Sequence, residues 1–235
     1  MPGNSDSRPR RPIRSFILRE GRLTHGQSRA LDRLMPVYGR DARDGTINAG
    51  QWFGRQAPLV VEIGFGNGEA LVDMAIQEPH WNFIGLEVHR PGVGHLLLRL
   101  ESQEIDNVRV IADDAVEVLS RDFEDGSIDR ICLYFPDPWP KKKHHKRRIV
   151  QDGFMAMISA KLAPGGIFHF ATDWEDYAFH ALEIIDRSPG LTNLAGGGCF
   201  SPRPGERPLT KFEQRGLNLG HGVWDILAQK SDSQD

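Results

Sequence analysis

Short apolar runs alternate with helical patterns between residues 59 and 185, and this alternation leaves the chain few possible folds. Five runs have the length and composition of buried strands: residues 59–63, 83–86, 108–111, 128–135 and 167–172. Apolar residues at helical spacing follow each run: residues 69–77, 96–100, 116–119, 150–162 and 174–185. Five consecutive strand–helix units predict an α/β fold with a doubly wound, mostly parallel sheet.

The N-terminal segment differs from this alternation. Residues 1–15 are rich in Arg, Pro and Ser, which predicts a disordered basic tail. Residues from Gln27 to Leu34 follow a helical pattern that predicts a short arm ending near Pro36, and a polar linker is expected around residues 45–54. We therefore divide the chain into a basic N-terminal tail and arm, residues 1–50, and one α/β domain, residues 51–235.

Glycine and proline set two further expectations. Gly165 and Gly166 are expected to end the helix of residues 150–162. After Gly190, abundant Gly and Pro predict loops and antiparallel strands without a helix, with one strand near Val223 to Leu227.

Composition excludes several classes of protein. No apolar run is long enough to span a bilayer, and the arginine-containing N-terminus lacks the apolar core of a secretory signal. Two cysteines, Cys132 and Cys199, provide neither a disulfide framework nor a four-ligand metal pattern. We expect a cytoplasmic protein with no membrane partner and no metal. Both a monomer and a homodimer stay open.

A glycine-rich turn follows the first predicted strand. It reads Glu62-Ile63-Gly64-Phe65-Gly66-Asn67-Gly68, so Gly64, Gly66 and Gly68 are spaced as G-x-G-x-G, whereas a dinucleotide-binding turn requires G-x-G-x-x-G. Glycines let the chain turn sharply and bring a ligand close to the backbone. The turn alone is typical of many α/β folds.

Carboxylates stand beside this turn. Glu62 precedes it, Glu87 ends the second strand, where an acid often binds a ribose diol, and Asp113 and Asp114 end the third strand. A pyrophosphate cofactor prefers cations in its pocket, whereas an acidic rim suits a ligand with a sulfonium, an ammonium and a ribose. The pattern therefore favours S-adenosylmethionine over NAD.

The fourth strand runs into an unusual motif. Phe135-Pro136-Asp137-Pro138-Trp139-Pro140 holds one carboxylate between two prolines, which fix the backbone on both sides of it. The side chain of Trp139 suits either stacking on a base or packing in the protein. Asp173 follows the fifth strand, so polar residues end all five strands, where α/β sheets bind ligands.

Positive charge is concentrated in two segments. Residues 141–148, Lys-Lys-Lys-His-His-Lys-Arg-Arg, carry six Lys or Arg and no acid, and residues 1–40 also carry a net charge of +6. The whole chain has a net charge of −3, so the other residues together carry −15. An acidic body with two basic segments is suited to binding a polyanion, and the neighbouring Asp137 motif favours a nucleic acid.

These segments resemble a class I S-adenosylmethionine methyltransferase, and with FPDPWPK they resemble the bacterial tRNA (guanine-N7)-methyltransferases. The resemblance covers roughly residues 20–230 and is carried by EIGFGNG, IGLEVHRPG, ADDA, YFPDPWPKKKHHKRR, ATDWEDYA and TKFEQRG. It implies a Rossmann-like sheet of seven strands, S-adenosyl-L-methionine as cofactor and tRNA as partner. The implied target is the guanosine at position 46 in the variable loop.

The resemblance also implies roles for individual residues. Cofactor contacts fall on four acids beside the glycine turn: Glu62, Glu87, Asp114 and Asp137. Substrate contacts fall on Lys141, Asp173, Thr210, Lys211, Phe212 and Glu213. RNA contacts fall on Lys143, His144, His145, Lys146, Arg147 and Arg148.

Guanine N7 carries a lone pair and no proton, so its methylation needs alignment and charge stabilisation and no general base. We assign the catalytic role to Asp137, supported by Asp173 and Glu213, and which acid takes which guanine edge stays open. Three other methyl- or RNA-related functions remain as alternatives: a methyltransferase for small molecules, a methylase for exocyclic amines, and an RNA-binding protein without cofactor. A dehydrogenase is disfavoured by the missing sixth-position glycine.

Overall fold

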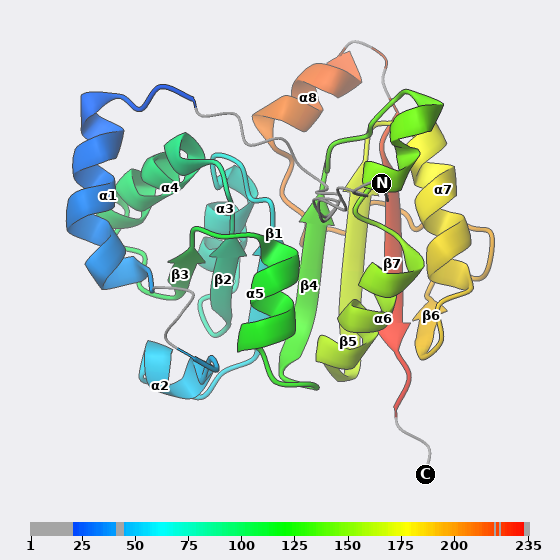
Figure 1. Ribbon diagram of the computed structural model, residues 1–235, viewed down its shortest axis with the longest axis horizontal. Helices are drawn as coiled ribbons and strands as arrows, with labels where there is room; N and C mark the ends of the chain where they lie inside the picture. The colour runs from blue at the N-terminus through cyan, green and yellow to red at the C-terminus, as the bar shows by residue number, and fades with distance from the viewer. Residues whose placement is uncertain (1–20, 41–44, 219, 221, 233–235) are drawn as a thin grey trace, which may run out of the picture.

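The computed structural model describes residues 21–40, 45–218, 220 and 222–232, which fold around one seven-stranded sheet (Figure 1). The strand order is β3-β2-β1-β4-β5-β7-β6. Strands β1 to β5 pair in parallel, and β7 is antiparallel to both β5 and β6. The strands are β1 Leu59–Ile63, β2 Asn82–Leu86, β3 Val108–Ile111, β4 Ile128–Tyr134, β5 Leu162–Thr172, β6 Leu191–Asn193 and β7 Trp224–Lys230.

Helices cover both faces of the sheet. Side chains alternate along β1, so that Val60 joins a core with α1, α3 and α4, whereas Val61 joins a core with α5, α6 and α7. The helices are α1 His25–Tyr38, α2 Ala49–Phe53, α3 Glu69–Gln77, α4 Arg90–Ser102, α5 Ala115–Asp122, α6 Asp152–Lys161, α7 Glu175–Asp186 and α8 Lys211–Asn218, with one 3₁₀ helix, η1 Lys142–Arg147. The predicted doubly wound α/β fold is confirmed.

The chain reverses its winding direction between β1 and β4. From β1 it winds outward through β2 and β3, then returns to place β4 on the other side of β1. In such sheets the crevice beyond the carboxyl ends of the strands at this reversal is the usual ligand site. All five predicted strand ends point to this edge, since β1 to β5 are parallel.

The N-terminal arm is a helix docked on α4. Thr24 and Gln27 form a capping box that starts α1, and Gln27 Nε2 also donates to the carbonyl of Pro91 at 3.1 Å. The helix continues through Pro36 to Tyr38, so its predicted end near Pro36 was too early. Proline removes only one helical hydrogen bond here, and the N–H of Gly39 closes the last turn on Met35. The predicted tail, residues 1–15, lies outside the described residues.

Three other element predictions were wrong. Helix α6 ends at Lys161, and Gly165 and Gly166 lie within β5 instead of ending the helix. A Cβ on Gly166 would come within 3.1 Å of two backbone carbonyls of the neighbouring strand β4, beside a shift in the β4–β5 register, so glycine is needed for this close approach. Helix α2 occupies the expected linker, and helix α8 occupies the tail that was predicted to contain no helix.

The strand predicted near Val223 to Leu227 is confirmed as β7. No helix in the described part of the chain combines the length and apolar character needed to cross a membrane. The domain division at residue 50 stays a prediction.

Candidate active site

Two adjoining cavities lie at the carboxyl edge of the sheet. The first, which we call the acidic cavity, has a volume of about 320 Å³ and is bordered by Glu87, Asp113, Asp114 and Asp137. The second, which we call the glycine-turn cavity, has a volume of about 420 Å³ and is lined by Glu62, residues 64–67, Glu69, Ala70, Tyr134, Phe135 and Thr210. Gly64, Tyr134 and Phe135 line both, so the two cavities form one crevice.

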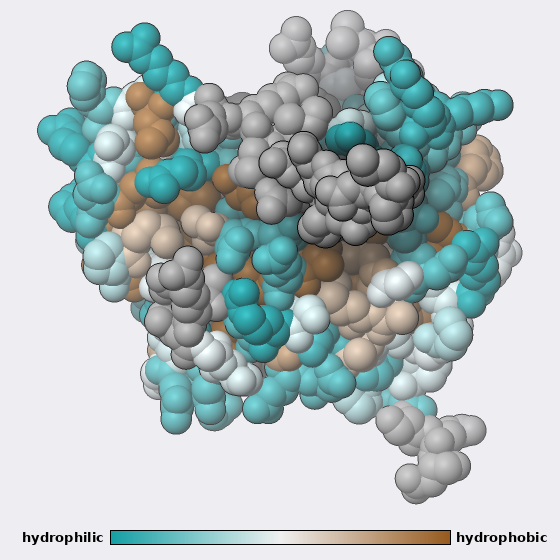
Figure 2. Space-filling model, viewed as in Figure 1, coloured by the Kyte–Doolittle hydropathy of each residue, from teal (hydrophilic) through white to brown (hydrophobic). Residues whose placement is uncertain are grey.

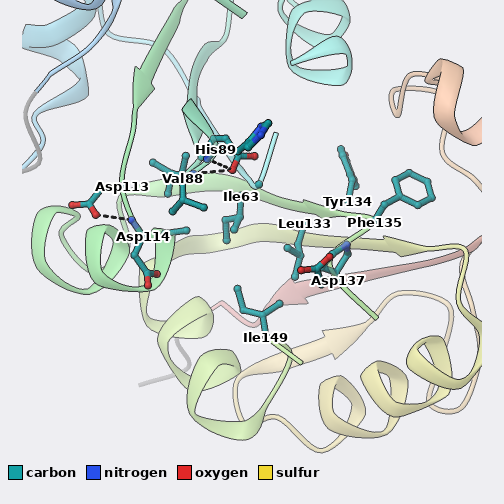
Figure 3. Close-up of a pocket in the computed structure, with 15 residues that line it drawn as sticks. Ile63, Val88, His89, Asp113, Asp114, Leu133, Tyr134, Phe135, Asp137 and Ile149 are labelled. Atoms are coloured by element: carbon teal, nitrogen blue, oxygen red, sulfur yellow. Dashed lines mark hydrogen bonds between the residues drawn. The ribbon is translucent and has the colours of Figure 1, made fainter. Parts of the chain in front are cut away.

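The acidic cavity has polar ends and an apolar middle. Figure 3 shows Asp113 and Asp114 on one side, Asp137 on the other, and the side chains of Ile63, Leu133 and Ile149 between them. An apolar middle between hydrogen-bond acceptors suits a flat, amine-bearing ring system.

Glu87 fixes the glycine turn against the end of β2. Its Oε2 accepts a hydrogen bond from the N–H of Gly66 at 2.8 Å, and its Oε1 accepts from the N–H groups of Val88 and His89, each at 2.8 Å (the latter two drawn in Figure 3). Asp114 starts α5, since its Oδ1 accepts from the N–H of Val116 at 3.0 Å. Both acids therefore sit in geometries fixed by the backbone before any ligand arrives.

Glu62 is a strongly perturbed acid of the crevice. It is 3% exposed, and burial together with the neighbouring Glu87 raises its pKa to about 8. Its Oε2 has no hydrogen-bond partner among the described residues. A buried carboxyl without a partner is costly, and a cation in the cavity beside it would remove that cost.

The glycine turn leaves room for a ligand. Gly64 and Gly66 have φ values of 71° and 57°, and a Cβ on either would meet no atom within 4 Å. Gly68 lines neither cavity. It stands at the N-cap of α3, where a Cβ would lie 2.6 Å from Leu96, so its role is close packing.

The loop that carries Asp137 is held in a strained conformation. Phe135 and Trp139 flank it with φ values of 50° and 46°, a region that costs non-glycine residues about 1–3 kcal/mol each. Arg148 stabilises this loop by donating from Nε to the carbonyl of Pro138 at 3.0 Å. Asp137 is exposed and borders the acidic cavity, and its predicted roles in cofactor binding and catalysis stay predictions.

Arg148 is not available to RNA, contrary to the prediction. Only 2% of the residue is exposed, its guanidinium pairs with Asp176, and it lies 4.8 Å from the ring centroid of Tyr177. The ring of Tyr177 and the ion pair with Asp176, whose own side chain stays exposed, thus hold Arg148 in the interior, although its charge is the same as that of its neighbours. The predicted contact fails because a run of like charges does not reveal which member turns inward.

The rest of the basic segment is accessible. Lys141, Lys142, Lys143 and Lys146 are exposed, and Arg147 lies over the ring of Trp139 at 4.9 Å. Burial and the surrounding cations lower the pKa of His144. Figure 2 shows hydrophilic side chains projecting from this edge of the molecule, near the start of α7.

The other predicted substrate residues differ in whether they line a cavity. Thr210 lines the glycine-turn cavity, whereas Lys141, Asp173 and Glu213 line neither cavity. Glu213 is 2% exposed, and both of its oxygens accept from Arg207, so it is not an open acceptor for guanine. The side chains of residues 211 and 212 lie outside the described part of the structure.

Sequence reasoning missed several residues that shape the crevice. Tyr134 lines both cavities, and the buried side chains of His169, Arg207 and Asp225 connect it to the segment around Thr210. Tyr134 directly precedes the FPDPWP motif, which was the one available signal. The other three are brought together only by the fold.

The sheet order and the acid-lined glycine turn define a class I S-adenosylmethionine-dependent methyltransferase. A family described as "Putative methyltransferase" matches residues 56–226. Two curated relatives named tRNA (guanine-N(7)-)-methyltransferase are similar over nearly the whole chain. The protein of Alcanivorax borkumensis is 57% identical, covering 94% of this chain and 92% of its own, and that of Pseudomonas putida strain F1 is 52% identical, covering 99% and 97%. The chain therefore belongs to the family of tRNA (guanine-N7)-methyltransferases.

Solved structures support the fold at low identity. The 16S rRNA methyltransferase KamB superposes with a TM-score of 0.56 at 13% identity, covering 79% of this chain and 94% of its own. The 16S rRNA (adenine(1408)-N(1))-methyltransferase of Catenulisporales acidiphilia with its cosubstrate gives 0.53 at 14% identity, covering 80% and 94%. The predicted family and the predicted class I fold are confirmed.

Proposed function

We propose that this protein transfers the methyl group of S-adenosyl-L-methionine to N7 of the guanosine at position 46 in the variable loop of tRNA. Family membership supports the reaction class. The observation that carries the proposal is that Asp137 borders the acidic cavity, while the exposed lysines of residues 141–143 begin four residues further along the chain. The proposed cofactor site and the proposed phosphate-binding surface thus lie next to each other, with Asp137 between them. Because bacterial tRNA is a cytoplasmic molecule, we place the reaction in the cytoplasm.

The crevice fits the cofactor that the family implies. Glu62 is a buried carboxyl in need of a cation and suits the ammonium, Glu87 suits the ribose hydroxyls, and Asp114 suits an adenine amine beside the apolar middle of the cavity. Space above Gly64 and Gly66 admits the ligand close to the backbone. When bound, S-adenosylmethionine supplies an electrophilic methyl group on a sulfonium.

Asp137 contributes electrostatics to the transfer. Its carboxylate accepts from the N1–H and N2–H of guanine, which draws electron density toward N7 and offsets the positive charge that develops on the ring. The two prolines and the bond from Arg148 keep the carboxylate in place without reorganisation. Alignment of the reacting groups in such a preformed site can supply roughly 7–11 kcal/mol of the barrier reduction.

The exposed cations hold the RNA. We assign phosphate contacts to Lys141, Lys143, Lys146 and Arg147, with His144 and His145 beside them, and we remove Arg148 from the predicted set. Asp173 and Thr210 remain proposed substrate contacts at the edges of the crevice.

The test is methyl transfer from tritiated cofactor to unmodified tRNA, followed by nucleoside analysis and by borohydride–aniline cleavage, which cuts RNA at 7-methylguanosine. We expect label in 7-methylguanosine and cleavage at position 46. A matched tRNA with adenosine at that position should accept no label. Label in another nucleoside, or equal label in both tRNAs, would overturn the proposal.

A further inference from the structure

A chain of buried polar groups connects α8 with β7. The Arg207 guanidinium donates from Nη1 to Glu213 Oε2 at 2.6 Å and from Nη2 to Glu213 Oε1 at 2.8 Å. The same group donates from Nη2 to Asp225 Oδ2 at 3.0 Å, and its Nε lies 2.7 Å from Asp225 Oδ1. Arg207 is 1% exposed, and the two acids are each 2% exposed. One arginine therefore bridges two buried carboxylates from different elements.

A second branch runs from Asp225 to the cavity wall. His169 Nε2 lies 2.8 Å from Asp225 Oδ1, and His169 Nδ1 lies 3.0 Å from the hydroxyl of Tyr134. Burial lowers the pKa of His169 despite the opposing effect of Asp225, so the ring is neutral at pH 7. Because a carboxylate only accepts, His169 donates to Asp225 through Nε2, and its Nδ1 faces the hydroxyl of Tyr134, which also donates to Cys132 Sγ at 3.1 Å.

Both branches end at the same crevice. On the α8 side, the N–H of Glu213 donates to Thr210 Oγ1 at 3.2 Å, and Thr210 lines the glycine-turn cavity. On the β4 side, Tyr134 lines both cavities. Arg207 also lies 5.8 Å from the ring centroid of Phe135, the third shared wall residue. Arg207 thus contacts or supports two parts of the wall that are far apart in sequence: Thr210, and the adjacent pair Tyr134 and Phe135.

Charge makes Arg207 necessary to this arrangement. Glu213 and Asp225 bring two buried negative charges, balanced by Arg207 and by the partly exposed Arg203, whose Nε lies 3.5 Å from Glu213 Oε1. Among the α8 residues whose side chains are described, only Glu213 is buried. Without Arg207 the two carboxylates would lose their shared partner, and α8 would lose its buried anchor.

We propose that Arg207 is a positioning residue for methyl transfer: through Glu213 and Asp225 it holds Thr210, Phe135 and Tyr134 in one arrangement around the crevice. It touches neither cavity, so it acts through these residues. The inference concerns the methyl transfer of the proposed function, and it does not depend on which nucleotide receives the group.

The experiment compares Arg207→Met and Arg207→Lys with a matched control, Lys161→Met. Lys161 is also a buried cation, bonded to Asp125 and to the carbonyl of Phe123, but it lies at the end of α6 away from the crevice. Each full-length protein is assayed for single-turnover methyl transfer at saturating tRNA and cofactor, for cofactor affinity by calorimetry, and for Tm. Glu213→Gln, which keeps the shape of the side chain, is the second variant if Arg207→Met does not fold.

We expect Arg207→Met to lower the single-turnover rate by at least 30-fold and Glu213→Gln by at least tenfold. Arg207→Lys should recover part of the rate, and Lys161→Met should keep the wild-type rate within threefold at a comparable loss of Tm. Rates within threefold of wild type for both Arg207→Met and Glu213→Gln would overturn the inference, as would a rate loss in Lys161→Met equal to that in Arg207→Met. An inactive wild-type protein would instead refute the proposed function.

Discussion

Glu62 makes the stability of this protein depend on pH in an unusual direction. An ordinary surface glutamate contributes little to pH dependence, but burial and Glu87 raise the pKa of Glu62 from 4.5 to about 8 in the folded protein. Between these two values the unfolded chain has released the proton while the folded chain still holds it. The folded state then binds more protons, so stability falls as pH rises, by about 1.4 kcal/mol per pH unit.

The magnitude follows from the same values. Between pH 6 and pH 8 the free energy of unfolding should fall by roughly 2–3 kcal/mol because of Glu62 alone. At about 2–4 °C per kcal/mol for a protein of this size, Tm should fall by roughly 5–10 °C over that range. The variant Glu62→Gln has no such proton and keeps the shape, so its Tm should be the higher one at pH 8 and should approach the wild-type value near pH 5.

Calorimetry measures the protonation of Glu62 independently, as the number of protons released when the cofactor binds. A bound cation next to Glu62 favours the carboxylate, so cofactor binding at pH 7 should release close to one proton. Titrations in buffers of different ionisation enthalpy measure that number, and Glu62→Gln should release none. Equal pH dependence of Tm in the wild type and in Glu62→Gln, together with equal proton release, would refute the assignment of a buried, protonated Glu62.

Four further predictions test the site and its surroundings. Asp137→Ala should lower the single-turnover rate by about 100-fold, since it removes a preorganised acceptor, and a rate within threefold of wild type would contradict its role. Lys143→Gln combined with Lys146→Gln should weaken tRNA binding in a filter-binding assay and reduce its salt dependence by about two phosphate contacts, with unchanged cofactor affinity. Arg148→Met should instead lower the free energy of unfolding by about 2 kcal/mol, measured by thermal unfolding, because it loses buried hydrogen bonds. Gly92→Ala should weaken cofactor binding at least tenfold, because its Cβ would lie 2.1 Å from the carbonyl of Gly66 and displace the turn; calorimetry with unchanged affinity would show that the turn tolerates the shift.

The sequence predicts the sheet well because its strands are set by local patterns. The runs ending at Ile63, Leu86 and Ile111 are mostly apolar, with Glu62 and Arg109 as single charged residues inside them, and each predicted strand agrees with the observed one within a residue. Parallel strands then bring their carboxyl ends to one edge. This topology explains why Glu87, Asp114 and Asp137, which each follow a predicted strand, border one cavity in the structure; their roles stay predictions.

The local sequence does not show which side chains become buried or which distant residues pair with each other. Arg148 and Lys143 belong to one basic run, yet one is buried and the other exposed, because only the fold places Tyr177 and Asp176 beside Arg148. Helix α8 was missed for a similar reason. Its stretch is polar, and its buried anchor, the pair of Glu213 with Arg207, is completed by Asp225 from β7. No local window reveals such a partner.

The bond from Arg148 to the carbonyl of Pro138 has a consequence for how this protein selects a nucleotide. Arg148 also pairs with Asp176 on α7, so the Asp137 loop, the basic segment and α7 are tied into a rigid body. The distance between the lysines that we propose bind phosphates and the carboxylate that we propose contacts the base is therefore fixed. Under the proposed function, this fixed distance lets the folded shape of the RNA determine which base reaches Asp137, without contacts to each flanking base.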